Sequence, residues 1–171
     1  MTESPGTNRV EVSLDEVVTA MDLPGDDLVS YLNRRTGELV TVTEEDLRAA
    51  ESDTEPADAS DWQAEMVAKA REVLQSDDFL ALPDKFEIHE YAIMERFCWQ
   101  VEDEPVRNAL LARIRGRGAF RRFRELLSES GITDQWYAYR QHALEEIAAE
   151  WLEANGIAYV RGLGRLAPDR L

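Results

Sequence analysis

The sequence predicts an α+β fold that is mainly α, in which short N-terminal strands, a hairpin and small helices pack on a four- to five-helix C-terminal body. Three observations support this. The N-terminal third carries β-rich runs beside turn residues, and the rest carries long stretches of helical period separated by glycines. Hydrophobic residues make up 44% of the chain and charged residues 32%, which is typical of a globular protein.

The first elements are a short strand and a helix. Residues 10–12 predict the strand, which leads into a helix from about Leu14. Ser13 and Glu16 occupy the two positions of a capping box at the start of that helix. The local sequence therefore fixes where this helix begins.

A hairpin and a second short helix follow. The stretch LVSYLNRRTGELVTV contains two β-rich runs joined at Thr36 and Gly37, which is a hairpin pattern. Thr43 then caps a helix that begins at TEEDLRAAE. A three-stranded sheet buries little surface alone, so we expect this unit to dock against helices.

Helices dominate from residue 61 onward. Glycines 116, 118, 131 and 156 separate or end the helical stretches in the C-terminal part. The expected helices cover about 61–75, 87–101, 104–115, 118–130 and 134–155. Four tryptophans at helical spacing, Trp62, Trp99, Trp136 and Trp151, are expected in the core.

Composition shifts along the chain divide it into segments that together form one domain. The stretch ESDTEPADAS is acidic, contains a proline and has few groups that pack, which is typical of a linker. The predicted segments are a disordered N-terminus (1–9), a β-hairpin and helix unit (10–50), the acidic linker (51–60), the helical body (61–160) and a tail (161–171).

The charge balance limits the classes of partner. The formal net charge is −16, from 35 acidic and 19 basic side chains, which argues against non-specific binding to nucleic acid and to anionic membranes. No apolar run reaches the length needed to span a bilayer, and the first ten residues lack the pattern of a signal peptide. With a single cysteine, Cys98, the chain has no disulfide framework, and we expect a cytoplasmic protein.

One stretch opposes the overall charge. RIRGRGAFRRFR, residues 113–124, holds six arginines and no acid. On a helical wheel Phe120 falls with the core positions, whereas three arginines share another side, at the start of a helix whose free N–H groups favour an anion. The candidate anion- or partner-binding residues are Arg115, Arg117, Gly118, Arg121 and Arg124. The alternative is that these arginines pair with the protein's own carboxylates, for example Glu145, Glu146, Glu150 and Glu153 of the C-terminal helix.

A second unusual charge is Arg140, which falls near the middle of an apolar arc on the C-terminal helix. A buried guanidinium requires a carboxylate partner, because an unpaired buried charge costs several kcal/mol. The helix in EIHEYAIMERFCWQV places Glu90 and Glu95 among apolar residues. We therefore expect a buried ion pair between Arg140 and either Glu90 or Glu95.

The sequence contains no pattern that argues for catalysis. His89 and His142 lie in different predicted helices and belong to no metal-ligand spacing, so no metal site and no cofactor are expected. There is no P-loop, dinucleotide fingerprint or nucleophile elbow, and no catalytic residue is assigned. Cys98 is expected to be an inert core thiol.

Several segments, in this order, resemble the bacterial uncharacterised protein family UPF0158. They are ALPDKFEIHEYAIMERF with its I-H-E-Y motif, IRGRGAFRRFRELL with R-G-R-G-A-F-R-R-F, and WYAYRQHALEEIAAEWLEANGI with W-Y-x-x-R. The hairpin YLNRRTGELV is similar to the N-terminal portion of that family. The resemblance runs from about Val10 to Tyr159 and implies a small bacterial cytoplasmic protein. It brings no activity, cofactor or catalytic residue.

Three functional hypotheses remain open at this point. The first is a non-enzymatic module that binds a protein partner or has a regulatory role through its arginine-rich helix start. The second is recognition of a phosphate-bearing ligand, such as a nucleotide or a structured RNA, by Arg117, Arg121 and Arg124. The third is a hydrolase-like pocket built from Glu90, His89 and Arg140, for which the helical wheel places His89 away from Glu90. The sequence leaves the oligomeric state open.

Overall fold

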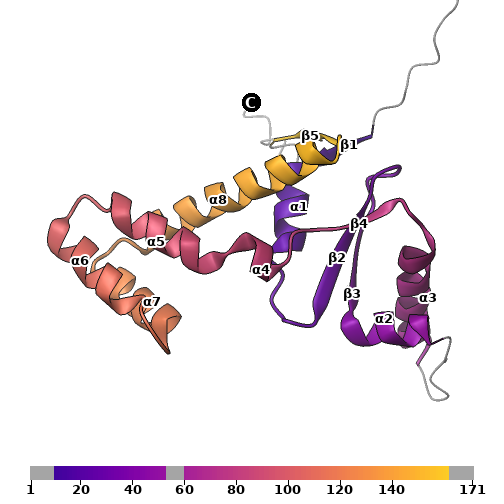
Figure 1. The fold of residues 1–171 in the computed structure, drawn as a ribbon, viewed down its shortest axis with the longest axis horizontal. Helices are drawn as coiled ribbons and strands as arrows, with labels where there is room; N and C mark the ends of the chain where they lie inside the picture. The colour runs from indigo at the N-terminus through magenta and orange to yellow at the C-terminus, as the bar shows by residue number, and fades with distance from the viewer. Residues whose placement is uncertain (1–9, 53–59, 162–171) are drawn as a thin grey trace, which may run out of the picture. The chain divides into compact units, whose positions relative to one another are not determined.

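Helices make up most of the computed structural model, which describes residues 10–52 and 60–161 (Figure 1). The predicted fold class, α+β and mainly α, is confirmed. The chain divides into two units, one formed by residues up to Asp84 together with those from Ala148 onward, and the other by residues 85–147. The predicted N-terminal segment 1–9, most of the acidic linker and the tail from residue 162 lie outside the described residues.

The first unit contains all the strands that the structure describes. In chain order its elements are β1 (Glu11–Ser13), α1 (Leu14–Met21), β2 (Leu28–Asn33), β3 (Leu39–Thr43), α2 (Glu44–Glu51), α3 (Asp61–Gln75), β4 (Phe79–Ala81) and β5 (Ala158–Val160). As predicted, Ser13 caps α1, accepting a hydrogen bond from the Glu16 N–H at 3.4 Å. Thr43 forms a complete capping box with Asp46 at the start of α2.

The strands form two small sheets. β2 lies between β3 and β4 and is antiparallel to both, and β1 pairs in parallel with β5. The third strand of the hairpin sheet is therefore β4, from the segment FLA, whereas residues 11–13 pair with the end of the described chain. Three-residue strands have too few positions to produce an alternating pattern, so neither pairing has a sequence signal.

The hairpin turn is built as its sequence predicts. The Asn33 side-chain oxygen accepts hydrogen bonds from the backbone N–H groups of Arg35 and Thr36, at 2.9 and 3.1 Å. Gly37 has φ of +76°, and a Cβ there would lie 3.0 Å from Cγ1 of Val10. Glycine is needed both for the left-handed backbone and for the close approach to the chain just before β1.

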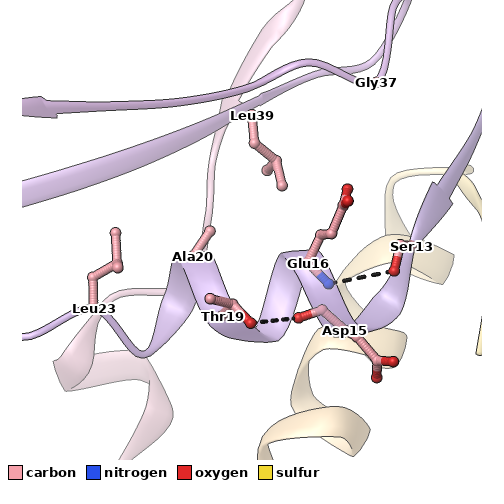
Figure 2. A pocket seen from close by; sticks show the side chains of 8 residues that line it. All are labelled: Ser13, Asp15, Glu16, Thr19, Ala20, Leu23, Gly37 and Leu39. Carbon is pink, nitrogen blue, oxygen red and sulfur yellow. Dashed lines mark hydrogen bonds between the residues drawn. The ribbon is translucent and has the colours of Figure 1, made fainter. Parts of the chain in front are cut away.

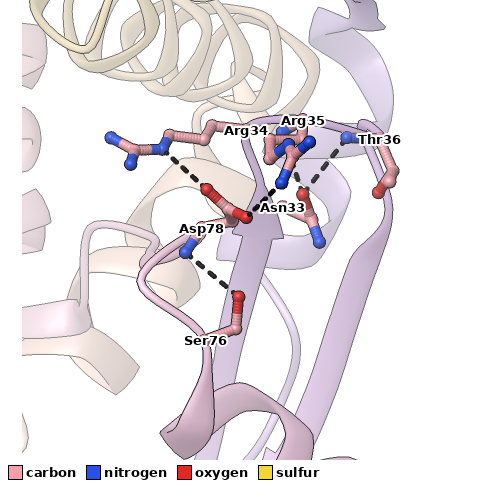
Figure 3. A network of polar contacts seen from close by, with 6 residues as sticks. All are labelled: Asn33, Arg34, Arg35, Thr36, Ser76 and Asp78. Carbon is pink, nitrogen blue, oxygen red and sulfur yellow. Dashed lines mark hydrogen bonds and ion pairs between the residues drawn. The ribbon is translucent and has the colours of Figure 1, made fainter.

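An acidic residue ties the hairpin turn to the chain before β4 (Figure 3). The Asp78 carboxylate accepts a hydrogen bond from Nε of Arg34 at 3.2 Å. It also forms an ion pair with Arg35, whose terminal nitrogen lies 3.5 Å away. The Arg34 backbone N–H also donates to the Asp78 carbonyl oxygen at 2.9 Å. This network joins residues 44 positions apart in the sequence.

The core of the first unit lies between the hairpin sheet and helices α2 and α3. Its buried residues are Val40, Val42, Ala50, Val67, Ala70 and Val73. The α3 positions in that core are three residues apart, so they form one helical stripe against the sheet. Because of this packing α3 belongs to the first unit, although the predicted helical body begins at residue 61.

The second unit is helical. It contains α4 (Lys85–Ile88), α5 (Glu90–Gln100), α6 (Glu104–Arg113), α7 (Ala119–Glu129) and the first part of α8 (Thr133–Ala154). Its core is aromatic: the Phe123 ring lies 4.9 Å from Trp136, and the Phe97 ring lies 5.3 Å from Trp136 and 6.2 Å from Phe123. These edge contacts hold one face of α7 inward, so its other face is presented to solvent.

Candidate functional site

The basic stretch 113–124 covers the end of α6, a turn and the first half of α7. Gly116 and Gly118 in the turn have φ of +81° and +74°. A Cβ at either position would meet nothing within 4 Å, so these glycines are explained by the left-handed backbone and not by lack of space. The turn therefore presents Arg115 and Arg117 on an open loop directly before α7.

Helix α7 is strongly two-sided. Its buried residues are Ala119, Phe123, Leu126 and Leu127. The exposed helical residues Phe120, Arg121 and Arg124 lie on one side of α7, and the exposed Arg117 stands in the turn two residues before the helix begins. We call these four residues the α7 basic face.

Phe120 corrects the sequence prediction. Its ring was expected in the core, but the side chain is 47% exposed. The residue lies at the edge of the apolar arc, next to the arginine stripe, and the packing around Phe123 does not reach it. The α7 basic face therefore combines three guanidinium groups with one exposed aromatic ring.

One arginine of the stretch is structural. The Arg122 guanidinium donates hydrogen bonds to the carbonyl oxygens of Arg113 at 3.4 Å and Arg115 at 2.5 Å. Carbonyl groups at the end of a helix have no partner within the helix, so Arg122 caps α6 and fixes the turn. This role was not visible in the sequence, because it depends on the fold-back of α7 on α6.

The remaining arginines are only partly matched by acids. Arg121 pairs with Glu125 of its own helix at 3.0 Å, in a contact whose side chains are 85% and 51% exposed. Within residues 10–52 and 60–161, neither Arg117 nor Arg124 makes an ion pair or a side-chain hydrogen bond. Three of the four α8 carboxylates expected as partners contact other residues: Glu145 contacts Gln141, Glu146 contacts His142 and Glu153 contacts Tyr159.

The electrostatics of the α7 start favour an anion. Gly118 occupies the cap position, contributes no side-chain hydrogen bond and is followed by a first turn without an acidic residue. The positive end of the helix dipole and the first N–H groups therefore lie beside Arg117 and Arg121. Like charges this close repel one another unless a negative group lies against them.

Arg140 lies against Glu90 in the second unit. Its Nε is 2.6 Å from Glu90 Oε1 and its Nη2 is 3.2 Å from Oε2, a two-point contact. The side chains are 22% and 29% exposed, so the pair is partly buried rather than fully buried. Glu95, the other candidate, is exposed on α5.

Of the three residues of a hydrolase-like pocket, His89 does not join Glu90 and Arg140. Among the described residues, the ring of His89 makes no hydrogen bond to Glu90 or Arg140, and it lies 6.2 Å from the ring of Phe86. His89 has φ of 57° and stands at the start of α5, with its side chain exposed. In the same part of the chain no group of three or more His, Cys, Asp or Glu side chains is placed to hold a metal ion.

The stretch that forms the α7 basic face lies within a region shared with other proteins. A family model described as "Uncharacterised protein family (UPF0158)" matches residues 7–163. The chain belongs to the UPF0158 family. A curated relative, the UPF0158 protein PA5073 of Pseudomonas aeruginosa, is 24% identical over 147 residues, which cover 85% of this chain and 84% of the relative. No solved structure matches.

Membership in this uncharacterised family assigns no activity to the chain. In the part of the chain that the structure describes, no helix combines the length and the apolar character needed to cross a membrane.

The first unit of this UPF0158 protein also contains a groove that the sequence did not predict (Figure 2). Its volume is about 580 Å³, and it lies between α1 and the β2–β3 hairpin. The lining residues are Ser13, Asp15, Glu16, Thr19, Ala20, Leu23, Gly37 and Leu39. The groove exists because α1 packs beside the hairpin that follows it, a tertiary contact that no local pattern reports.

Proposed function

We propose that this UPF0158 protein is a non-enzymatic binding module whose α7 basic face contacts an acidic surface of a partner protein. The observation that carries the proposal is that Arg117 and Arg124 are exposed and have no acidic partner within the described chain, in a protein of net charge −16. The protein's own carboxylates thus leave these two charges unmatched. An acidic surface laid across α7 removes their mutual repulsion.

The composition of the face favours a protein over a nucleic acid. Phe120 lies among the arginines and is 47% exposed. Arginine and aromatic side chains are enriched at the energetic centres of protein interfaces. A nucleic acid backbone is repelled by the other acidic surfaces of the chain, whereas a protein partner needs only one local acidic patch.

A second candidate is a phosphate-bearing ligand. The observation that favours it is the start of α7, where Gly118 provides no capping side chain and Arg117 and Arg121 lie next to the first N–H groups. Arginine forks and helix N-termini both bind phosphate. A phosphate-bearing ligand uses the same arginines as a protein partner but requires no apolar contact. A substitution of Phe120 therefore distinguishes the two candidates.

The test is a binding titration monitored by fluorescence anisotropy. Labelled poly-L-glutamate, inorganic polyphosphate and a short RNA are each titrated with wild-type protein and with the variant Arg117→Glu/Arg124→Glu. The control variant is Arg48→Glu/Arg96→Glu, which changes two exposed arginines outside α7. Both variants shift the net charge from −16 to −20, because each substitution removes one positive and adds one negative charge.

We expect the α7 variant to lose at least tenfold in affinity for poly-L-glutamate, while the control variant changes by less than threefold. Equal losses in both variants would show that only overall charge matters and would contradict the proposal. A Phe120→Ala variant separates the two candidates. It should weaken binding of an acidic peptide that contains apolar side chains, and it should leave polyphosphate binding unchanged.

A further inference from the structure

The groove of the first unit has an apolar interior with acidic groups at its edge. Figure 2 shows Leu39 pointing from the hairpin toward α1, and Leu23 and Glu16 pointing from α1 toward the hairpin. The hydroxyl groups are used locally: Ser13 accepts from the Glu16 N–H, and Thr19 donates to the Asp15 carbonyl at 2.8 Å. The charged groups that face an occupant are therefore carboxylates.

Neither carboxylate at the groove is neutralised. Within the described residues, the side chains of Asp15 and Glu16 make no ion pair with a basic residue. The occupant that fits this chemistry is an apolar or aromatic side chain flanked by cations. The α7 basic face has this composition, with Phe120 beside Arg117, Arg121 and Arg124.

The helical parts of the two surfaces also agree in length. At about 1.5 Å per residue, the stretch of α7 from Phe120 to Arg124 is about 6 Å long. On α1 the groove residues Glu16 and Ala20 have the same four-residue span and are also about 6 Å apart along the helix. An amphipathic helix that lies in such a groove is a common mode of protein recognition.

We infer that the groove of one molecule receives the α7 basic face of a second copy of this chain. This inference rests on the proposed function and names one partner for it. Phe120 enters between Leu23 and Leu39, the arginines reach the carboxylate of Glu16 at the border, and Asp15 beside it adds negative charge. The arginine stems cover apolar surface at the rim while their charged ends stay near solvent.

The contact is of the head-to-tail type, because it joins two different surfaces. Each molecule keeps one unused face and one unused groove, so association continues beyond the dimer unless a ring closes. A single helix stripe in a groove is a small interface, which corresponds to weak and concentration-dependent association. The net charge of −16 on each copy opposes association further.

The experiment is sedimentation velocity at several protein concentrations and 0.15 M salt, with two neutralised variants. The face variant is Arg117→Gln/Arg124→Gln, and the groove variant is Asp15→Asn/Glu16→Gln. We expect wild-type protein to form dimers and longer species as concentration rises. Each variant alone should associate at least tenfold more weakly, with circular dichroism and melting temperature showing that both are folded.

Mixing the two variants gives the decisive result. The face variant still has an intact groove, and the groove variant still has an intact face, so an equimolar mixture should form one-to-one dimers that do not extend. A chain with all four substitutions should remain monomeric alone. Absence of dimers in the mixture would overturn the inference, as would self-association of the face variant at wild-type strength.

The poly-L-glutamate titration distinguishes failure of the second copy as partner from failure of the proposed function. Wild-type protein that stays monomeric, but binds poly-L-glutamate through Arg117 and Arg124, would overturn the second copy as partner and leave the proposed function standing. A protein that neither self-associates nor binds poly-L-glutamate would overturn both the second copy as partner and the proposed function. If the groove variant alone fails to fold, the substitution Ala20→Arg, which places a cation in the groove, replaces it in the same mixture.

Discussion

The guanidinium of Arg140 makes a two-point contact with the carboxylate of Glu90, with nitrogen to oxygen distances of 2.6 and 3.2 Å. This contact joins α8 to the first turn of α5 across 50 positions of sequence. Glu90 is also placed where the positive end of the α5 dipole favours an acid. The pair therefore serves the architecture of the second unit.

The substitution Glu90→Ala should lower the free energy of unfolding by about 2 kcal/mol, because it removes the two-point contact to a partly buried guanidinium. The measurement is urea unfolding of wild-type protein, Glu90→Ala, Arg140→Ala and the double variant. Their double-mutant cycle should give a coupling of about 1 kcal/mol. A coupling near zero would mean that the contact contributes nothing to stability and that each residue acts alone.

Arg122 and Arg124 are two residues apart in the sequence but have different roles. Replacing Arg122 by alanine should lower the free energy of unfolding by about 1 to 2 kcal/mol, because the carbonyl groups of Arg113 and Arg115 lose their donor. Arg124→Ala should change it by less than about 0.5 kcal/mol, since that side chain is exposed and has no partner among the described residues. Thermal unfolding of both variants is the measurement, and equal losses would contradict this division.

Cys98 should be chemically silent in the folded protein. Its side chain is fully buried, and burial raises the pKa of the Cys98 thiol from 9.0 to about 11, with the Glu95 carboxylate as a smaller cause in the same direction. Because the thiolate is the reactive form, Cys98 should react with a disulfide reagent at pH 8 only after urea is added. Fast reaction in native buffer would show that α5 opens readily.

The same shift predicts a pH dependence of stability. Between pH 9 and pH 11 the unfolded thiol has lost its proton while the folded thiol keeps it, so the folded state binds more protons and its stability falls as pH rises. The Cys98→Ala variant should lack this component, and the difference between the two stability curves should change by about 2 to 3 kcal/mol across that window. Parallel curves would contradict the assignment.

His89 is in a backbone conformation that favours glycine, with φ of 57° and ψ of 61°. Its side chain is exposed, so little packing is lost on substitution. His89→Gly should leave the free energy of unfolding unchanged or raise it by up to about 1 kcal/mol, and His89→Val should lower it by about 1 to 2 kcal/mol. Urea unfolding of the two variants tests this, and a loss in His89→Gly would assign a role to the imidazole.

The sequence was a good guide where structure depends on local chemistry. The caps at Ser13 and Thr43 and the turn at Gly37 mark element boundaries through short-range hydrogen bonds and backbone conformation. Helices α5 to α8 follow the predicted ranges closely, because glycines and amphipathic periods define them. Each capping residue or glycine lies within a few residues of the element boundary that it defines.

The sequence was a poor guide where structure depends on distant contacts. β4 and β5 are too short to carry a period, and the groove beside α1 arises from a meeting with the hairpin. Helical spacing placed Trp62, Trp99 and Phe120 in the core, but their side chains are 67%, 62% and 47% exposed. A wheel gives the direction of a side chain and not the extent to which neighbours cover that side.

The candidate site shows both cases. Arg121 and Arg124 lie on one side of α7 as their spacing predicts, whereas Arg117, which the helical wheel placed with them, lies in the turn before the uncapped helix start. The sequence did not indicate that Arg122 turns back to α6, nor that Glu145, Glu146 and Glu153 of α8 would contact other residues. Pairing between charged side chains depends on tertiary geometry, and composition alone does not assign it.

The central claim, that the α7 basic face is the binding surface, is tested most directly by residue-resolved NMR. A 19.5 kDa chain is suitable for amide chemical-shift mapping during titration with poly-L-glutamate. We predict that the largest shift changes fall on residues 117–124 and are absent in Arg117→Glu/Arg124→Glu. Changes centred on other exposed arginines, such as Arg48 or Arg96, or spread evenly over all basic residues, would contradict the claim.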